Sequence, residues 1–207
     1  MATTTARDIV EVVASLDLHE KHEKYLALHA NRLAYAINAI KAYRTKKSIK
    51  RLLDIGPHFL TRCICEFFPD IEVSTLGWKM EKFVPVSLYK EHIQYDLNDC
   101  GSSEIVSQQA PFDLIVCSEV IEHLYTSPAI VLNSLQRLLT ARGAILIQTP
   151  NAATLSARLT LLRGRNPYQL IREQKTNPGH FREYTLDELV TYARAAGFTV
   201  LEAQYCS

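Results

Sequence analysis

The sequence predicts an α/β fold, in which a mostly parallel sheet of six or seven strands carries helices on both faces and a helical cap precedes the sheet. Two apolar runs, 51–56 and 112–119, have the composition of buried parallel strands that end in polar residues. From residue 50 onward, strand and helix patterns alternate at the spacing of right-handed βαβ crossovers. The fold class follows from this alternation.

The first 49 residues are predicted to form the helical cap. Apolar residues recur at helical spacing through 8–44, and the pattern is interrupted near 17–19, so we expect two helices. The cap could simply pack on the sheet or could act as a lid over a bound molecule, and the pattern is compatible with both.

Residues 50–207 are predicted to form the α/β domain. The expected strands cover 50–55, 71–76, 92–95, 112–118, 143–149 and 198–201, and the expected helices cover 59–68, 127–140 and 186–195. Pro128 is suited to a first helical turn, and Thr185 with Glu188 forms a capping box. The segment 151–184 is long for a strand-to-helix connection, which is typical of a functional loop or lid.

Composition excludes several classes of protein. The chain has 207 residues, 47% of them hydrophobic and 22% charged, and a net charge of +1, so no global field attracts nucleic acid or anionic membrane. We find no apolar run near the roughly 18 residues of a membrane span and no secretory signal, and therefore expect a cytoplasmic protein. The five cysteines are scattered and have no partner pair at zinc spacing, so the sequence predicts neither a disulfide nor a metal site.

Four motifs resemble those of class I S-adenosylmethionine-dependent methyltransferases. They are Leu-Leu-Asp-Ile-Gly at 52–56, Asp-Leu at 96–97, Ser-Glu-Val-Ile-Glu-His-Leu at 118–124, and Arg-Gly followed by four aliphatic residues at 142–147. The later stretches 162–168 and 180–185 are similar to methyltransferases found among polysaccharide and glycolipid biosynthesis enzymes. The resemblance implies a Rossmann-like fold and S-adenosyl-L-methionine as the cofactor.

The resemblance also implies roles for individual residues. Asp54 would approach the cofactor's ammonium group, and Gly56 would let the backbone come close to the methionine moiety. Asp96 and the Leu97 amide would bind the adenine. Ser118 and Glu119 would line the floor beneath the methyl group.

Two departures from the family pattern affect the expected cofactor site. After Gly56 the usual second and third loop glycines are replaced by His58 and Leu60, so the His58 side chain must turn away from the cofactor or contact it. The second strand ends in Gly77 and Trp78, where an acid usually binds the ribose, and Trp78 could cover the ribose or adenine instead. We therefore expect weakened or rearranged cofactor binding.

The expected reaction is methyl transfer to a small-molecule or glycan-like acceptor, at oxygen. His123 and His180 are the candidate bases for the acceptor's proton. The insertion carries a local excess of basic residues, suited to an anionic acceptor or simply to solvent: Arg158, Arg163, Arg165, Arg172, Lys175 and Arg182.

Two further expectations concern partners. The family adds a seventh, antiparallel strand, whereas this sequence stops soon after the sixth, so we expect either a six-stranded sheet or a truncated sequence. An uncovered strand edge could then pair in a homodimer. The alternative to an enzyme is a non-catalytic binding module, in which His58 and Trp78 fill the adenosyl site.

Overall fold

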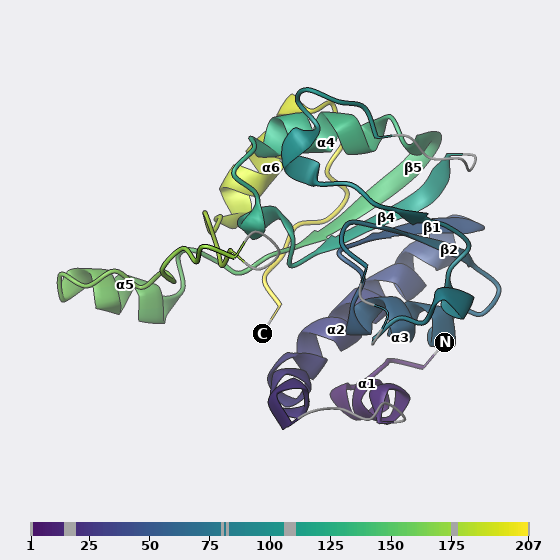
Figure 1. Cartoon of the computed structure of the whole chain (residues 1–207), viewed down its shortest axis with the longest axis horizontal. Helices are drawn as coiled ribbons and strands as arrows, with labels where there is room; N and C mark the ends of the chain where they lie inside the picture. The colour runs from purple at the N-terminus through teal and green to yellow at the C-terminus, as the bar shows by residue number, and fades with distance from the viewer. Residues whose placement is uncertain are drawn as a thin grey trace.

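The computed structural model describes residues 2–14, 20–79, 81, 83–105, 111–174 and 178–206. In this part of the chain, five parallel strands form one sheet in the order β3-β2-β1-β4-β5 (Figure 1). The strands are β1 (Arg51–Ile55), β2 (Glu72–Leu76), β3 (His92–Ile93), β4 (Phe112–Ser118) and β5 (Leu139–Gln148). The predicted parallel α/β sheet is confirmed.

The helices cover both faces of the sheet (Figure 1). They are α1 (Ala6–Val13), α2 (Glu20–Lys46), α3 (Phe59–Phe67), α4 (Pro128–Gln136), α5 (Leu155–Leu162) and α6 (Leu186–Ala195), with short 3₁₀ turns η1 (Val86–Leu88), η2 (Leu97–Asp99) and η3 (Ile121–His123). Helices α1, α2 and α3 cover one face, and α4 and α6 lie on the other.

Side-chain alternation along the strands divides the core into two layers. Leu52 and Val116 pack in the cluster beneath α1–α3, whereas their neighbours Leu53 and Ile115 pack in the cluster beneath α4. Successive strand residues point to opposite faces, so a strand buried on both sides must be apolar almost throughout. The apolar runs of β1 and β4 follow from this double burial.

Local capping chemistry fixes several helix starts. The Thr5 side chain accepts from the Asp8 amide at the start of α1, and Thr185 does the same with the Glu188 amide at α6, where the predicted capping box is confirmed. Pro128 occupies the first turn of α4, as predicted.

Some predicted boundaries were wrong. The helix expected over 127–140 ends at Gln136, and β5 begins at Leu139, because Leu139 pairs with Phe112 and an irregularity in the register absorbs the next residues. The third strand is limited to His92–Ile93. The break predicted near 17–19 lies outside the described residues, although α1 and α2 flank it.

The predicted sixth strand over 198–201 does not form in the described residues. The Phe198 amide donates to the Ala193 carbonyl at the end of α6, and residues 201–206 are exposed. A strand requires a hydrogen-bonded neighbour, and β5 has no pairing with this segment in the described part of the sheet.

The segment between β5 and α6 closes on itself. Asn151 and Tyr184 form an isolated bridge, and the Ala152 amide donates to the Tyr184 carbonyl at 3.0 Å. Helix α5, which sequence analysis did not predict, extends away from the sheet within this segment (Figure 1).

The strand order places a topological switch point between β1 and β4. These strands are neighbours, and the chain proceeds from β1 toward β3 on one side and from β4 toward β5 on the other. Ligands of open α/β sheets bind in the crevice outside the carboxyl ends of such strands. Within the described residues, no helix is long and apolar enough to cross a bilayer.

Candidate active site

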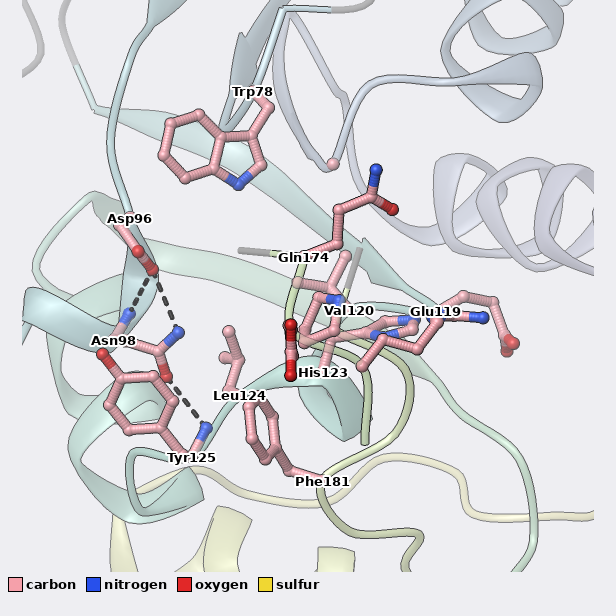
Figure 2. Close-up of a pocket in the computed structure, with 14 residues that line it drawn as sticks. Trp78, Asp96, Asn98, Glu119, Val120, His123, Leu124, Tyr125, Gln174 and Phe181 are labelled. Carbon is pink, nitrogen blue, oxygen red and sulfur yellow. Dashed lines mark hydrogen bonds between the residues drawn. The ribbon is translucent and has the colours of Figure 1, made fainter. Parts of the chain in front are cut away.

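A cavity of about 390 Å³ opens at the carboxyl ends of β1 and β4. Figure 2 shows Trp78 and Asp96 on one side, with Val120, His123 and Phe181 on the other. The complete lining is Gly56, Trp78, Asp96, Asn98, Glu119, Val120, His123, Leu124, Tyr125, Arg172, Glu173, Gln174, Pro178 and Phe181. Ligand sites commonly have volumes of about 300–1,000 Å³, so the cavity has the size of a small-molecule site.

A smaller hollow of about 30 Å³ continues from this cavity, sharing Gly56 and Glu119 with it. Its lining adds three predicted site residues, Asp54, His58 and Ser118. Seven of the predicted cofactor-contacting residues therefore line one of two adjoining spaces. Leu97 and Gly77 line neither.

Two glycines allow the backbone to turn at the ends of β1 and β2. Gly56 has φ +73°, and a Cβ there would lie 2.8 Å from Val120 Cγ2. Gly77 has φ +123°, and its amide donates to the Ile93 carbonyl. An L side chain is strained at such angles. Gly56 thus keeps open a space that any side chain would narrow.

Asp54 is buried at the end of β1 and accepts a hydrogen bond from Thr61 Oγ1 at 2.5 Å. Burial raises the pKa of its carboxyl to about 7, an effect that the Thr61 hydrogen bond partly offsets. A cationic group that reached the loop after β1 would favour the ionised carboxylate.

His58 caps the start of α3 in place of a loop glycine. Its ring packs in an aromatic cluster with centroid distances of 4.3 Å to Phe59, 4.5 Å to Phe83 and 5.6 Å to Tyr25. The sequence left open whether the His58 side chain turns away from the cofactor site or contacts it. The ring packs largely in the aromatic cluster beside α2, and the larger cavity stays open.

Asp96 and Asn98 form one hydrogen-bonded unit on the cavity wall (Figure 2). Asp96 Oδ1 accepts from the Asn98 amide and from Asn98 Nδ2, both at 3.0 Å. Asn98 Oδ1 in turn accepts from the Tyr125 amide at 2.9 Å and the Thr126 amide at 3.2 Å. Leu97 between them is buried, so its side chain anchors the unit.

Trp78 follows Gly77 and lies opposite Tyr125 and Phe181 in the view of Figure 2. Its side chain is 38% exposed, so it forms part of the cavity wall and is not a core indole. A flat heterocycle could stack on such a surface.

The segment after β4 carries the charged part of the site. Glu119 has φ +58°, an unusual backbone conformation for a residue other than glycine, and its carboxylate pairs with Arg32 of α2 at 2.5 Å. Ser118 Oγ donates to Gln148 Oε1 at 3.0 Å. Helix α2 thus supplies a residue to the site and is more than a packing cap.

Glu122 is fully buried beside Glu119. Its Oε2 accepts from Thr149 Oγ1 at 2.9 Å, and its Oε1 has no hydrogen-bond partner among the described residues. Burial raises the pKa of both carboxyls, and the charge of Glu122 raises that of Glu119 further. Two buried acids side by side favour a cation in their vicinity.

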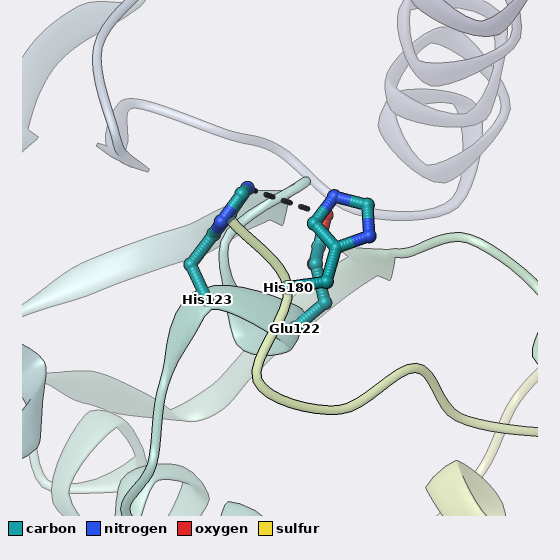
Figure 3. A group of neighbouring side chains, drawn as sticks. All are labelled: Glu122, His123 and His180. Atoms are coloured by element: carbon teal, nitrogen blue, oxygen red, sulfur yellow. Dashed lines mark ion pairs between the residues drawn. The ribbon is translucent and has the colours of Figure 1, made fainter. Parts of the chain in front are cut away.

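The two predicted histidines come together from distant parts of the chain (Figure 3). Their ring centroids lie 4.8 Å apart, His123 on η3 and His180 in the segment before α6. Burial lowers the pKa of His123, which favours the neutral ring at neutral pH. His123 lines the cavity, whereas His180 packs against His123 and does not line the cavity.

Several site residues were missed by sequence analysis. Arg32 and Tyr25 sit in a helical pattern that predicts only packing, and Asn98 follows Asp96 in what reads as an ordinary turn. Glu122 belongs to a quoted motif but received no role; an acid between two apolar residues of that motif was the available signal.

Most of the basic residues of the insertion lie away from the cavity. Arg158, Arg163 and Arg165 are exposed on and after α5, and of the predicted basic set only Arg172 lines the cavity in the described residues. Lys175 lies outside the described residues.

Comparisons with known proteins agree with this geometry. A family model described as a methyltransferase domain matches residues 25–203. A curated protein of Mycolicibacterium smegmatis, named "Probable S-adenosylmethionine-dependent methyltransferase", is 25% identical over 135 residues, which cover 65% of this chain and 47% of that protein. The chain thus spans about half the length of this curated relative.

Solved structures share the fold. The plantazolicin methyltransferase BamL, crystallised with a triazolic desmethylPZN analog and SAH, superposes with a TM-score of 0.59 at 15% identity, covering 92% of this chain and 73% of BamL. A SAM dependent methyltransferase from Archaeoglobus fulgidus gives 0.55 at 16% identity, covering 85% and 74%. With its family match over most of its length, the chain belongs to the methyltransferase domain family and has the fold of the class I S-adenosylmethionine-dependent methyltransferases.

Proposed function

We propose that this protein transfers the methyl group of S-adenosyl-L-methionine to an oxygen of a small-molecule or glycan-like acceptor. The observation that carries the proposal is the cavity of about 390 Å³ at the β1–β4 switch point, with Gly56, Trp78 and Asp96 in its wall. Family membership supports the reaction type, and the position of the cavity supports the cofactor.

The residues present fit the cofactor. Trp78 offers a flat surface, and Asp96 offers a carboxylate held in place by Asn98. Gly56 leaves room that a Cβ would fill, and Asp54 lies in the adjoining hollow, where it can face an ammonium group. We assign the adenosyl end to Trp78 and Asp96 and the methionine end to Gly56 and Asp54.

The bound cofactor would supply the electrophilic methyl group, and the protein would position the acceptor and accept its proton. His123 borders the cavity, and its Nδ1 donates to the Gly179 carbonyl at 2.7 Å, which leaves Nε2 as the nitrogen able to accept a proton. His180 packs against it and orients the ring. In this arrangement His123 is the general base and His180 positions it.

The acceptor would enter between Tyr125 on one side and residues 172–174, 178 and 181 on the other. Arg172 is the basic group of the insertion on the cavity wall, so an anionic acceptor would be recognised there. Pairing of an exposed sheet edge in a homodimer stays a prediction.

Isothermal titration of the chain with S-adenosylhomocysteine tests the proposal. Saturable binding at one site per chain is expected, and Gly56→Ala should weaken it. Absence of binding at millimolar ligand would reject the proposal in favour of a non-catalytic binding module. That module would have the adenosyl site filled by His58 and Trp78, whereas the cavity beside them is open.

A further inference from the structure

Glu122, His123 and His180 direct three donor atoms toward one point. The donor atoms lie within 4.8 Å of one another, and His123 Nε2 is 3.9 Å from Glu122 Oε1. Figure 3 shows one ring nitrogen of His180 turned toward both of the other side chains. The three side chains lie beside the cavity, and His123 forms part of its lining.

The Nδ1 hydrogen bonds of His123 and His180 determine which ring nitrogen of each can bind a metal ion. His123 Nδ1 is 2.7 Å from the Gly179 carbonyl, an atom that can only accept, so Nδ1 carries the proton and Nε2 presents a lone pair. His180 Nδ1 is 2.9 Å from Glu183 Oε1, which assigns the same tautomer to the neutral ring. Histidines that bind metals usually donate their second N–H to a carbonyl or carboxylate in this way.

The buried carboxylate provides an independent observation. Glu122 is fully buried, and its Oε1 has no hydrogen-bond partner among the described residues. In the neutral tautomers both imidazoles turn lone pairs toward the cluster, so neither ring donates to this oxygen. A buried polar atom without a partner is unfavourable, and a cation between the three donors would satisfy it.

The charges around the cluster agree with a missing cation. The acids Glu119, Glu122 and Glu183 are balanced by Arg32, which pairs with Glu119, and by Arg172, whose charge acts on His123. When all three acids are ionised, one negative charge remains in excess, and a bound cation would favour this ionised state. Thr149 and the Gly179 carbonyl, which also hydrogen-bond to the cluster, are uncharged.

We propose that Glu122, His123 and His180 bind a divalent transition-metal ion, with an open coordination position toward the cavity. Two imidazole nitrogens and one carboxylate oxygen suit Zn²⁺, Co²⁺ or Fe²⁺ better than Mg²⁺ or Ca²⁺. Bonds of about 2.0–2.2 Å would place the donors roughly 3.4 Å apart, so the three side chains must close by up to about 1.5 Å around the ion.

The role of the ion rests on the proposed methyl transfer, whereas its binding does not. An acceptor hydroxyl that occupied the open position would have its pKa lowered, and it could then lose its proton to solvent. With the ion bound, His123 and His180 act as metal ligands. The ion, and not His123 as a general base, would then activate the acceptor.

The test is Co²⁺ and Zn²⁺ binding to the chelator-treated full chain, measured by titration calorimetry and by Co²⁺ absorption. One site per chain is expected, with ligand-field bands of nitrogen and oxygen coordination and without a thiolate-to-cobalt charge-transfer band. His180→Ala should weaken binding at least about 100-fold. Glu183→Gln, which alters the second contact of His180 and removes a charge near Glu122, should weaken it about 10- to 100-fold.

His92→Ala is the matched control, because His92 lies on β3 away from the cluster and bonds to Thr75 of β2. It should leave the affinity for the ion unchanged. Circular dichroism of each variant checks folding, and Glu183→Gln keeps the test valid if His180→Ala does not fold. Failure of the wild-type chain to bind either ion would overturn the inference, as would equal affinities for Glu183→Gln, His180→Ala and the control.

Binding of S-adenosylhomocysteine is measured on the same samples. Binding of this ligand without binding of the metal refutes the metal site and leaves the proposed function intact. The reverse result refutes the proposed function and leaves the metal site intact.

Discussion

The buried carboxyl of Asp54 makes the stability of the protein depend on pH. Burial raises its pKa from 3.8 to about 7 in the folded state. Between these values the unfolded chain ionises Asp54 while the folded chain keeps it protonated, so the folded state binds more protons and stability falls as pH rises. Below 3.8 and above about 7 the contribution is constant.

The size of this effect follows from the two pKa values. At about 1.4 kcal/mol for each tenfold change in proton affinity, the difference amounts to about 4 kcal/mol. A typical domain has only about 5–15 kcal/mol of stability, so the effect is measurable. Asp54→Asn removes the titration while its amide oxygen can still accept from Thr61.

Urea unfolding from pH 4 to pH 8, without cofactor, measures the prediction. The free energy of unfolding of the wild type should fall by about 4 kcal/mol more than that of Asp54→Asn over this range. The raised pKa values of Glu119 and Glu122 affect both proteins, so the difference isolates Asp54. Asp187→Asn, at an exposed position on α6, should follow the wild type. Parallel curves for the wild type and Asp54→Asn would refute the reasoning.

Three further substitutions probe the cavity. Gly56→Ala should weaken S-adenosylhomocysteine binding at least about tenfold in calorimetry, because its Cβ would meet Val120. Gly164→Ala is the control, since Gly164 has φ +69° and open space around it. This control should lower the free energy of unfolding by the backbone strain of about 1–2 kcal/mol and leave binding unchanged. Trp78→Ala should weaken the same binding about tenfold with little change in thermal stability, since its ring is partly exposed; unchanged affinity would remove it from the adenosyl site. Asn98→Ala should lower the free energy of unfolding by about 1–3 kcal/mol in urea, because the Tyr125 and Thr126 amides lose their acceptor; an unaltered midpoint contradicts this.

The sequence was sufficient to predict the sheet and the strand ends that border the cavity. Runs such as 51–55 and 112–118 are mostly apolar because both of their faces are buried, and such a run can be recognised in the sequence alone. The segment 198–201 has the same composition but lacks a hydrogen-bonded partner, and a partner is a property of the fold that local pattern does not encode.

The part of the site at or near the strand ends was the most predictable. Asp54 lies near the end of β1 and Gly56 directly follows it, whereas Arg32 reaches the site from a long helix through tertiary packing. His123 and His180 were predicted separately, and their contact depends on the path of the segment after α5. Their relation to Glu122 therefore required the three-dimensional structure.

The two walls of the cavity come from separate stretches of the chain. Strand-end residues between 56 and 125 form one wall, and residues 172–174, 178 and 181 form the other, on a segment whose ends are tied by the bridge between Asn151 and Tyr184. Because this tie and the contacts of Gly179 and Phe181 with His123 and Glu122 anchor the segment independently of α5, replacement of α5 itself can leave both walls of the cavity in place. The sequence of α5 can therefore vary, by natural change or by engineering, without loss of the cavity.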